Sequence, residues 1–171
     1  MPSDEIRHAL SNVGEHYSAH PEDGRSEDKP AKAILDSGLR INVKGPGSWS
    51  ITTDMPSALG GEGSAPSPGW LRRAAQAACE ATMVAIGAAR EGISLDRLEV
   101  TVGSISDDRG MLGLSDEAPA GPTESWARVT VSAKGISHER LRKIVEWAEA
   151  HSPVTDSLKR AVPHTLEVEI L

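Results

Sequence analysis

The chain has 171 residues, enough for one domain with a sizeable core, and its 38% hydrophobic and 25% charged residues are ordinary for a soluble globular protein. Asp and Glu outnumber Lys and Arg by 25 to 18, giving a formal net charge of -7. This balance excludes duplex nucleic acid and anionic membrane as main partners, because both attract positively charged surfaces.

The start of the chain has neither the basic segment nor the apolar segment of a signal peptide, and no apolar stretch approaches the length of a membrane span. The single cysteine, Cys79, cannot form an intramolecular disulfide. We therefore expect a cytoplasmic protein.

The N-terminal half predicts one helix and three strands. Apolar residues at helical spacing predict a helix over residues 3–18 that ends before Pro21, and we assign residues 1–30 to an N-terminal helical extension. Residues 31–36, 39–44 and 48–53 read as short strands joined by glycine-containing turns. A loop rich in Gly, Ser and Pro follows over residues 59–68.

A long alanine-rich helix is predicted from Pro68 to about Arg90. Ser67 can cap its N-terminus, Pro68 suits its first turn, and Gly92 can supply a left-handed C-terminal cap. Its many small side chains indicate close packing on several sides, as in a helix between sheets or subunits.

The C-terminal half predicts three strands and two helices. Residues 98–104 and 126–133 alternate like strands, and the residues between them, 105–125, read as a structureless segment that is a functional lid or disordered. Ser137 caps a helix that Pro153 ends, a short helix covers residues 155–160, and residues 164–170 read as a terminal strand. This order predicts an α+β fold in a single domain, with residues 31–171 as its core.

Several short segments, in this order and spacing, resemble the OsmC/Ohr family of thiol-dependent hydroperoxide reductases. They are Leu-Gly-Gly at 59–61, Pro-Ser-Pro at 66–68, Ala-Cys at 78–79, Glu-Val-Thr-Val at 99–102, the segment 144–154 and Ala-Val-Pro at 161–163. The resemblance implies antiparallel sheets with a long central helix and an intertwined homodimer whose active sites lie at the subunit interface.

The resemblance also assigns site residues. Cys79 matches the cysteine that attacks the peroxide, and Ser152 falls where the family has the second cysteine, which closes a disulfide. Arg40 is the best match to an arginine that tunes the reactive thiol, and the position of a tuning glutamate is Gly69 here. A sulfenic acid formed on Cys79 would therefore have to be resolved by an external thiol, because a serine cannot do so.

The same residues also have simpler interpretations. Cys79 can be a small buried hydrophobe, Arg40 a solvated strand residue and Ser152 a C-terminal helix residue before Pro153. His16 and His20 have the spacing of metal ligands on one helical face but lack a third ligand, and Gly60–Gly63 lacks the ending of a phosphate-binding loop. We therefore expect no metal and no cofactor.

Three hypotheses for function follow. The first is reduction of small apolar organic hydroperoxides through Cys79, with an external thiol as reductant, in defence against oxidative stress. The alternative is a catalytically inactive OsmC-like protein that binds a small molecule in the dimer-interface pocket or has another stress-associated role. The third is adduct formation between Cys79 and an electrophile.

Overall fold

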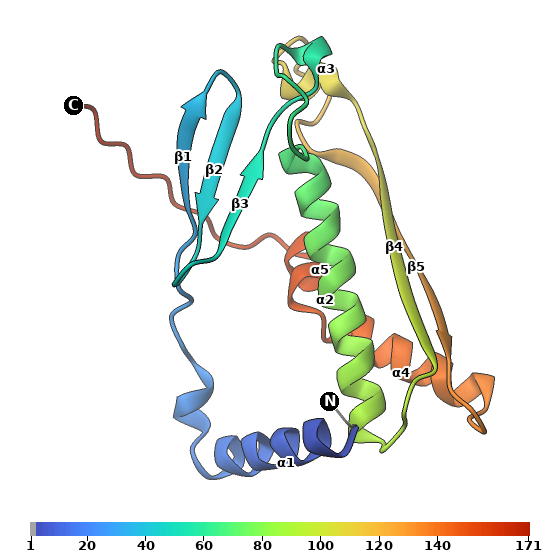
Figure 1. Cartoon of the computed structure of the whole chain (residues 1–171). Coiled ribbons are helices and arrows are strands. Elements are labelled where there is room, and N and C mark those ends of the chain that lie inside the picture. The colour runs from blue at the N-terminus through green and yellow to red at the C-terminus, as the bar shows by residue number, and fades with distance from the viewer. Residues whose placement is uncertain (1–2) are drawn as a thin grey trace. The chain divides into compact units, whose positions relative to one another are not determined.

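The computed structural model describes residues 3–171 and is an α+β fold with antiparallel strands and one long helix, as predicted (Figure 1). The chain divides into two compact units. The first unit holds Gln76–Ile105 and Pro122–Leu171 together with residues 3–7, and the second holds His8–Ala75 and Ser106–Gly121. The prediction of a single domain with an extension at residues 1–30 stays a prediction.

The first unit contains the main apolar core. Its elements are most of the long helix α2 (Pro68–Arg90), the two-stranded sheet of β4 (Arg97–Ser106) and β5 (Pro122–Ser132), and the helices α4 (His138–Ala150) and α5 (Pro153–Lys159). The buried core residues come from α2, α4 and the segments that flank the sheet: Val84, Ala88, Ile93, Ala133, Leu141, Ile144 and Ala148. The core is therefore built from aliphatic side chains, as the absence of Phe requires.

Small residues let α2 and α4 approach closely. A Cβ atom added at Gly87 of α2 would lie 3.0 Å from Trp147 Cε3 and 3.1 Å from Ile144 Cγ2, both on α4. The guanidinium of Arg90 lies 4.8 Å from the ring centroid of Trp147, and Arg140 Nε donates to Glu91 Oε2 at 2.7 Å. The predicted close packing of the alanine-rich helix is confirmed on this side.

The second unit holds a three-stranded antiparallel sheet in the order β1 (Lys32–Ser37), β2 (Arg40–Lys44) and β3 (Ser50–Thr53). It also contains most of α1 (Ser3–Ala19) and the short 3-10 helices η1 (Pro21–Gly24) and η2 (Ser57–Leu59). All six residues of β1 are exposed, including Ile34 and Leu35, and Ile51 of β3 is half-exposed. Because a sheet needs a layer to bury its apolar face, this unit by itself leaves the sheet uncovered.

The prediction of a structureless segment over residues 105–125 is wrong. β4 continues to Ser106, β5 begins at Pro122, and the residues between them contain the short helix α3 (Asp108–Met111). The Asp107 carboxylate caps α3 by accepting from Arg109 N at 3.1 Å and also forms an ion pair with the Arg109 guanidinium. These hydrogen bonds lower the pKa of Asp107 and raise that of Arg109. Such local side-chain bonds stabilise a short helix that periodicity cannot reveal.

The predicted strand over residues 164–170 is also wrong for the single chain. Residues 161–171 are exposed and without regular structure, and the apolar Leu166, Val168 and Ile170 lie open to solvent. A strand exists only when its backbone groups are paired, and within residues 3–171 no strand pairs with this segment. Among the same residues, no helix is both long and apolar enough to span a membrane.

Candidate functional site

Cys79 and Ser152, 73 positions apart in the sequence, are in direct contact within the first unit. The Ser152 hydroxyl donates a hydrogen bond to Cys79 Sγ across 3.2 Å. Cys79 is half-buried in the middle of α2, whereas Ser152 is fully buried. The contact holds the sulfur against the start of α5, and the Cys79 residue as a whole is partly exposed.

Ser152 also has a structural role at the start of α5. It is the N-cap residue, and its hydroxyl oxygen accepts from Thr155 N at 3.4 Å while Pro153 occupies the first helical turn. The interpretation of Ser152 as a C-terminal helix residue before Pro153 is therefore wrong, because α4 ends at Ala150 and Ser152 precedes the first residue of α5. The predicted start of this helix at residue 155 is two residues late, because proline is well tolerated in a first turn.

The residue after the cysteine, Glu80, makes a second link between α2 and α5. Its side chain is 4% exposed, and its Oε1 accepts from Thr155 Oγ1 at 2.8 Å and from Gln76 Nε2 at 3.3 Å. A buried carboxylate requires such donors, because an unpaired one is strongly unfavourable. Two neighbouring residues of α2, Cys79 and Glu80, are thus fixed by two residues of the first turn of α5, Ser152 and Thr155.

Arg40 lies in the second unit, at the start of β2. Its Nε donates to Asp36 Oδ2 at 3.1 Å and its Nη1 donates to Ser64 Oγ at 2.6 Å. Its side chain is 34% exposed. Its role as the partner of Cys79 stays a prediction.

In the same unit as Arg40, a buried aspartate organises the loop that leads toward α2. Asp54 is 1% exposed, and its carboxylate accepts hydrogen bonds from Met55 N, Glu62 N, Ser64 N and Ser64 Oγ at 2.7–3.2 Å. These donors, above all Ser64 N, lower the pKa of Asp54, because they stabilise its anionic form. A side chain at Gly61 would overlap the Met55 carbonyl oxygen, so only glycine fits there. Asp54 thereby fixes Ser64, the residue that holds Arg40.

Sequence reasoning missed Glu80, Thr155 and Asp54. Glu80 follows Cys79 in the sequence and points about 100° away from it around the helix. Nothing in the sequence indicated that Glu80 would accept a hydrogen bond from Thr155 of α5. Asp54 had a weak signal, since an acidic residue between a strand and a Gly-Ser-rich loop commonly bonds to loop backbone. No group of three or more metal-ligating side chains occurs within the chain from residue 3 onward.

Comparison with known proteins shows that the chain matches one protein family. Residues 61–167 match the family model described as OsmC-like protein, whereas no curated protein sequence matches the chain. Similar solved structures include an OsmC-like protein from Mycoplasma pneumoniae, with a TM-score of 0.68 and 14% identity over 80% of this chain and 91% of that one.

Two further similar structures carry functional names. An organic hydroperoxide resistance protein OsmC from Legionella pneumophila has a TM-score of 0.58 and 22% identity over 79% of this chain and 91% of that one. An organic hydroperoxide resistance protein from Bacillus subtilis has a TM-score of 0.50 and 20% identity over 77% and 92% of the two chains. At these identities the likeness establishes a shared fold.

Proposed function

Because the chain belongs to the OsmC-like protein family, we propose that it reduces small apolar organic hydroperoxides through the single thiol of Cys79. The observation that carries the proposal is the 3.2 Å contact between Cys79 Sγ and Ser152 Oγ. It joins the two positions that, by the sequence resemblance, hold the attacking and the resolving cysteine. Two similar structures are named as organic hydroperoxide resistance proteins.

The proposed cycle has two chemical steps. The thiolate of Cys79 attacks one peroxide oxygen, the O–O bond breaks, and a proton converts the departing alkoxide to an alcohol, leaving a sulfenic acid on Cys79. An external dithiol then attacks the sulfenic sulfur and releases water. Its second thiol displaces Cys79 from the mixed disulfide, which returns the protein to its thiol form and leaves the reductant as a disulfide.

Ser152 has a positioning role in this proposal. Its hydroxyl cannot form a disulfide, so the sulfenic acid must remain reachable by an outside thiol. The half-buried state of Cys79 is compatible with such access. Arg40 is proposed as the charged partner of the thiol. Its guanidinium is oriented by hydrogen bonds to Asp36 and Ser64.

We also propose that the working form is a homodimer. Two apolar surfaces are uncovered in their own units: the β1–β2–β3 sheet, and the alternating residues Leu166, Val168 and Ile170 of the C-terminal segment. A second copy would supply a covering layer and pairing strands, because each protomer offers both kinds of surface. Light scattering should give twice the 18.1 kDa mass of the chain, and a monomeric mass at micromolar concentration would refute this part.

The activity is tested by intact-mass analysis of the reduced protein after addition of limiting cumene hydroperoxide, with Cys79→Ser as the control. We expect one added oxygen on the wild-type chain and none on the variant, followed by turnover when dithiothreitol is supplied. An unmodified Cys79 under conditions that oxidise a control thiol would refute peroxide reduction.

That outcome would support the second candidate, a catalytically inactive protein of the same fold that binds a small molecule. The specific observation in its favour is that Ser152 is fully buried and already engaged as the cap of α5. In that case, binding of the small molecule should be unchanged in Cys79→Ala.

A further inference from the structure

Two adjoining cavities lie between β5 and α4 in the first unit. One has a volume of about 210 Å³ and the other about 260 Å³, and both are lined by Val129 and Val145. We call them together the β5–α4 groove. Its other lining residues are Val131, His138, Leu141 and Arg142 in the first cavity, and Glu80, Val84, Ala127, Ala148 and Glu149 in the second.

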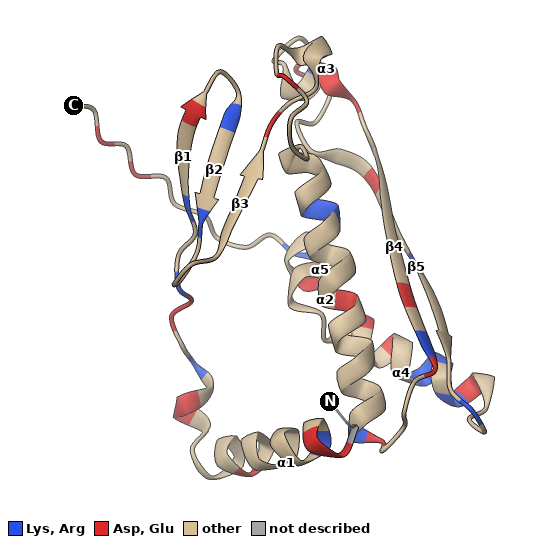
Figure 2. Ribbon diagram, viewed as in Figure 1, with Lys and Arg blue, Asp and Glu red and all other residues tan. Residues whose placement is uncertain are grey.

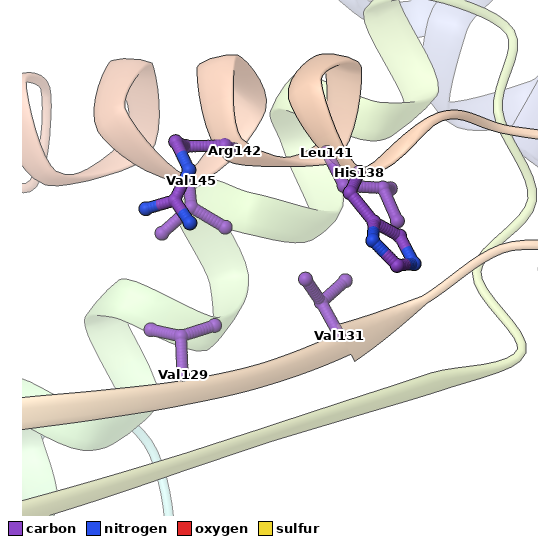
Figure 3. Close-up of a pocket in the computed structure, with 6 residues that line it drawn as sticks. All are labelled: Val129, Val131, His138, Leu141, Arg142 and Val145. Atoms are coloured by element: carbon purple, nitrogen blue, oxygen red, sulfur yellow. The ribbon is translucent and has the colours of Figure 1, made fainter.

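The floor of the groove is aliphatic. Val129 and Val131 stand on the same face of β5, because alternate residues of a strand point the same way, and they face Leu141 and Val145 of α4 (Figure 3). Apolar side chains that line an unfilled space lack van der Waals contacts on that side. A hollow with an apolar lining and a few polar groups is typical of a small-molecule site.

One end of the groove carries a positive charge that no residue of the described chain neutralises. Helix α4 bears residues of both signs (Figure 2). Its other two cations are paired, since Arg140 bonds to Glu91 and Lys143 to Glu139. Over residues 3–171, by contrast, Arg142 forms neither a hydrogen bond nor an ion pair, and it lines the first cavity beside His138.

The carboxylates at the other end are already satisfied. Glu149 accepts from Lys159 Nζ at 2.7 Å, and Glu80 accepts from Thr155 and Gln76. The groove therefore offers one free cationic end beside a stretch of aliphatic side chains, which is complementary to a ligand with one anionic group and one apolar tail.

We propose that the β5–α4 groove binds an aliphatic carboxylate, with its carboxylate on Arg142 and His138 and its chain along Val129, Val131 and Val145. The groove runs along α4 from Arg142 to Ala148, six residues or about 9 Å, which suits a chain of medium length. Cys79 lines neither cavity, so this site is distinct from the thiol and does not depend on the proposed peroxide chemistry.

The test is isothermal titration calorimetry of the full chain with octanoate, hexanoate and octylammonium. We expect saturable binding of octanoate, about tenfold tighter than that of hexanoate because two more methylene groups are buried, and no binding of octylammonium. Arg142→Gln should weaken octanoate binding at least tenfold. Lys143→Gln, which removes the same charge from the neighbouring residue outside the groove, should leave it unchanged.

Two further variants test whether octanoate lies along the apolar floor and apart from the thiol. Val131→Thr keeps the side-chain shape but puts a hydroxyl on the floor, and should weaken octanoate binding several-fold with an unchanged circular dichroism spectrum. Cys79→Ser should bind octanoate as the wild type does, whatever the outcome of the peroxide assay. Absence of saturable binding, for example because a second copy covers the groove, would overturn the proposal. Equal binding of octylammonium or equal binding by Arg142→Gln would do the same.

Discussion

Replacing Ser152 with cysteine should allow a disulfide to form between this position and Cys79. The Ser152 hydroxyl oxygen already lies 3.2 Å from Cys79 Sγ, so a sulfur atom in its place needs only a small side-chain rotation to bond to Cys79. On oxidation, the mass of the Ser152→Cys monomer should fall by that of two hydrogen atoms, because the disulfide forms within one chain. The oxidised variant should also resist thiol alkylation.

The size of the effect follows from the loop that the bond would close. The two positions are 73 residues apart, and a cross-link of that span removes chain entropy from the unfolded state worth about 4 kcal/mol. The reduced form of the variant should be less stable than wild type by about 1 kcal/mol, because cysteine is a poorer N-cap for α5 than serine. Oxidation should therefore change the stability of Ser152→Cys far more than that of the wild type.

The assay is urea denaturation of oxidised and reduced Ser152→Cys, with Ser157→Cys as the matched control. Ser157 lies on the same helix, is exposed and bonds only to the backbone of Val154. Its variant should form no disulfide with Cys79 within one chain. The reasoning is refuted if Ser152→Cys keeps two free thiols after oxidation, since that would mean that the two side chains are not in contact.

Four further predictions concern stability. Gly87→Ala should destabilise the protein by about 1 kcal/mol in urea denaturation, because overpacking against α4 outweighs the gain in helix propensity. Gly14→Ala, in open space on α1, should instead stabilise it by up to about 1 kcal/mol, and the opposite order would contradict the α2–α4 packing. Thr155→Val should cost about 2 kcal/mol because buried Glu80 loses a donor, and an unchanged denaturation midpoint would argue against that bond. The pKa of Asp54 is lowered on folding, so its stabilising contribution is present above its unfolded pKa of 3.8 and is lost as the pH falls through the folded value. Asp54→Asn should therefore have a lower denaturation midpoint than the wild type at neutral pH, and the two midpoints should become equal in acid. A difference that stays constant with pH would contradict the hydrogen bonds between Asp54 and the loop.

Elements with strong local signals could be predicted from the sequence. Ser67, Pro68 and the alanine-rich run specify α2, which spans Pro68–Arg90 as expected. The three N-terminal strands are confirmed to within two residues, since turns at glycine set where each ends. Gly38, Gly47 and Gly92 have the positive φ that such turns and helix ends require.

Elements that depend on distant partners could not be predicted. Residues 164–170 alternate like a strand, but alternation gives only a tendency and pairing requires a second strand. The segment between β4 and β5 has no periodicity, yet Asp107 and Arg109 give it a helix through side-chain bonds.

Some residues of the candidate site could be predicted from the sequence, whereas their contacts could not. Motif order in the sequence pointed to Cys79, Ser152 and Arg40 through a family resemblance, and it left their mutual placement open. The contact of Cys79 with Ser152 arises because α4 packs on α2 and ends where Ser152 can start α5 beside the sulfur. Glu80 acquires its partner Thr155 by the same packing, 75 residues away in the sequence.

The sequence by itself determined the family, the α+β class and the long helix, because these depend on residue type and local spacing. Only the tertiary structure decided which side chains meet: the Ser152 hydroxyl with the Cys79 sulfur, Thr155 with Glu80, and Ser64 with Arg40. It also revealed the β5–α4 groove, whose walls come from separate segments. The physical reason is that helices and turns are set largely by interactions within a few residues, whereas hydrogen bonds between buried side chains and the shapes of cavities depend on how distant segments pack.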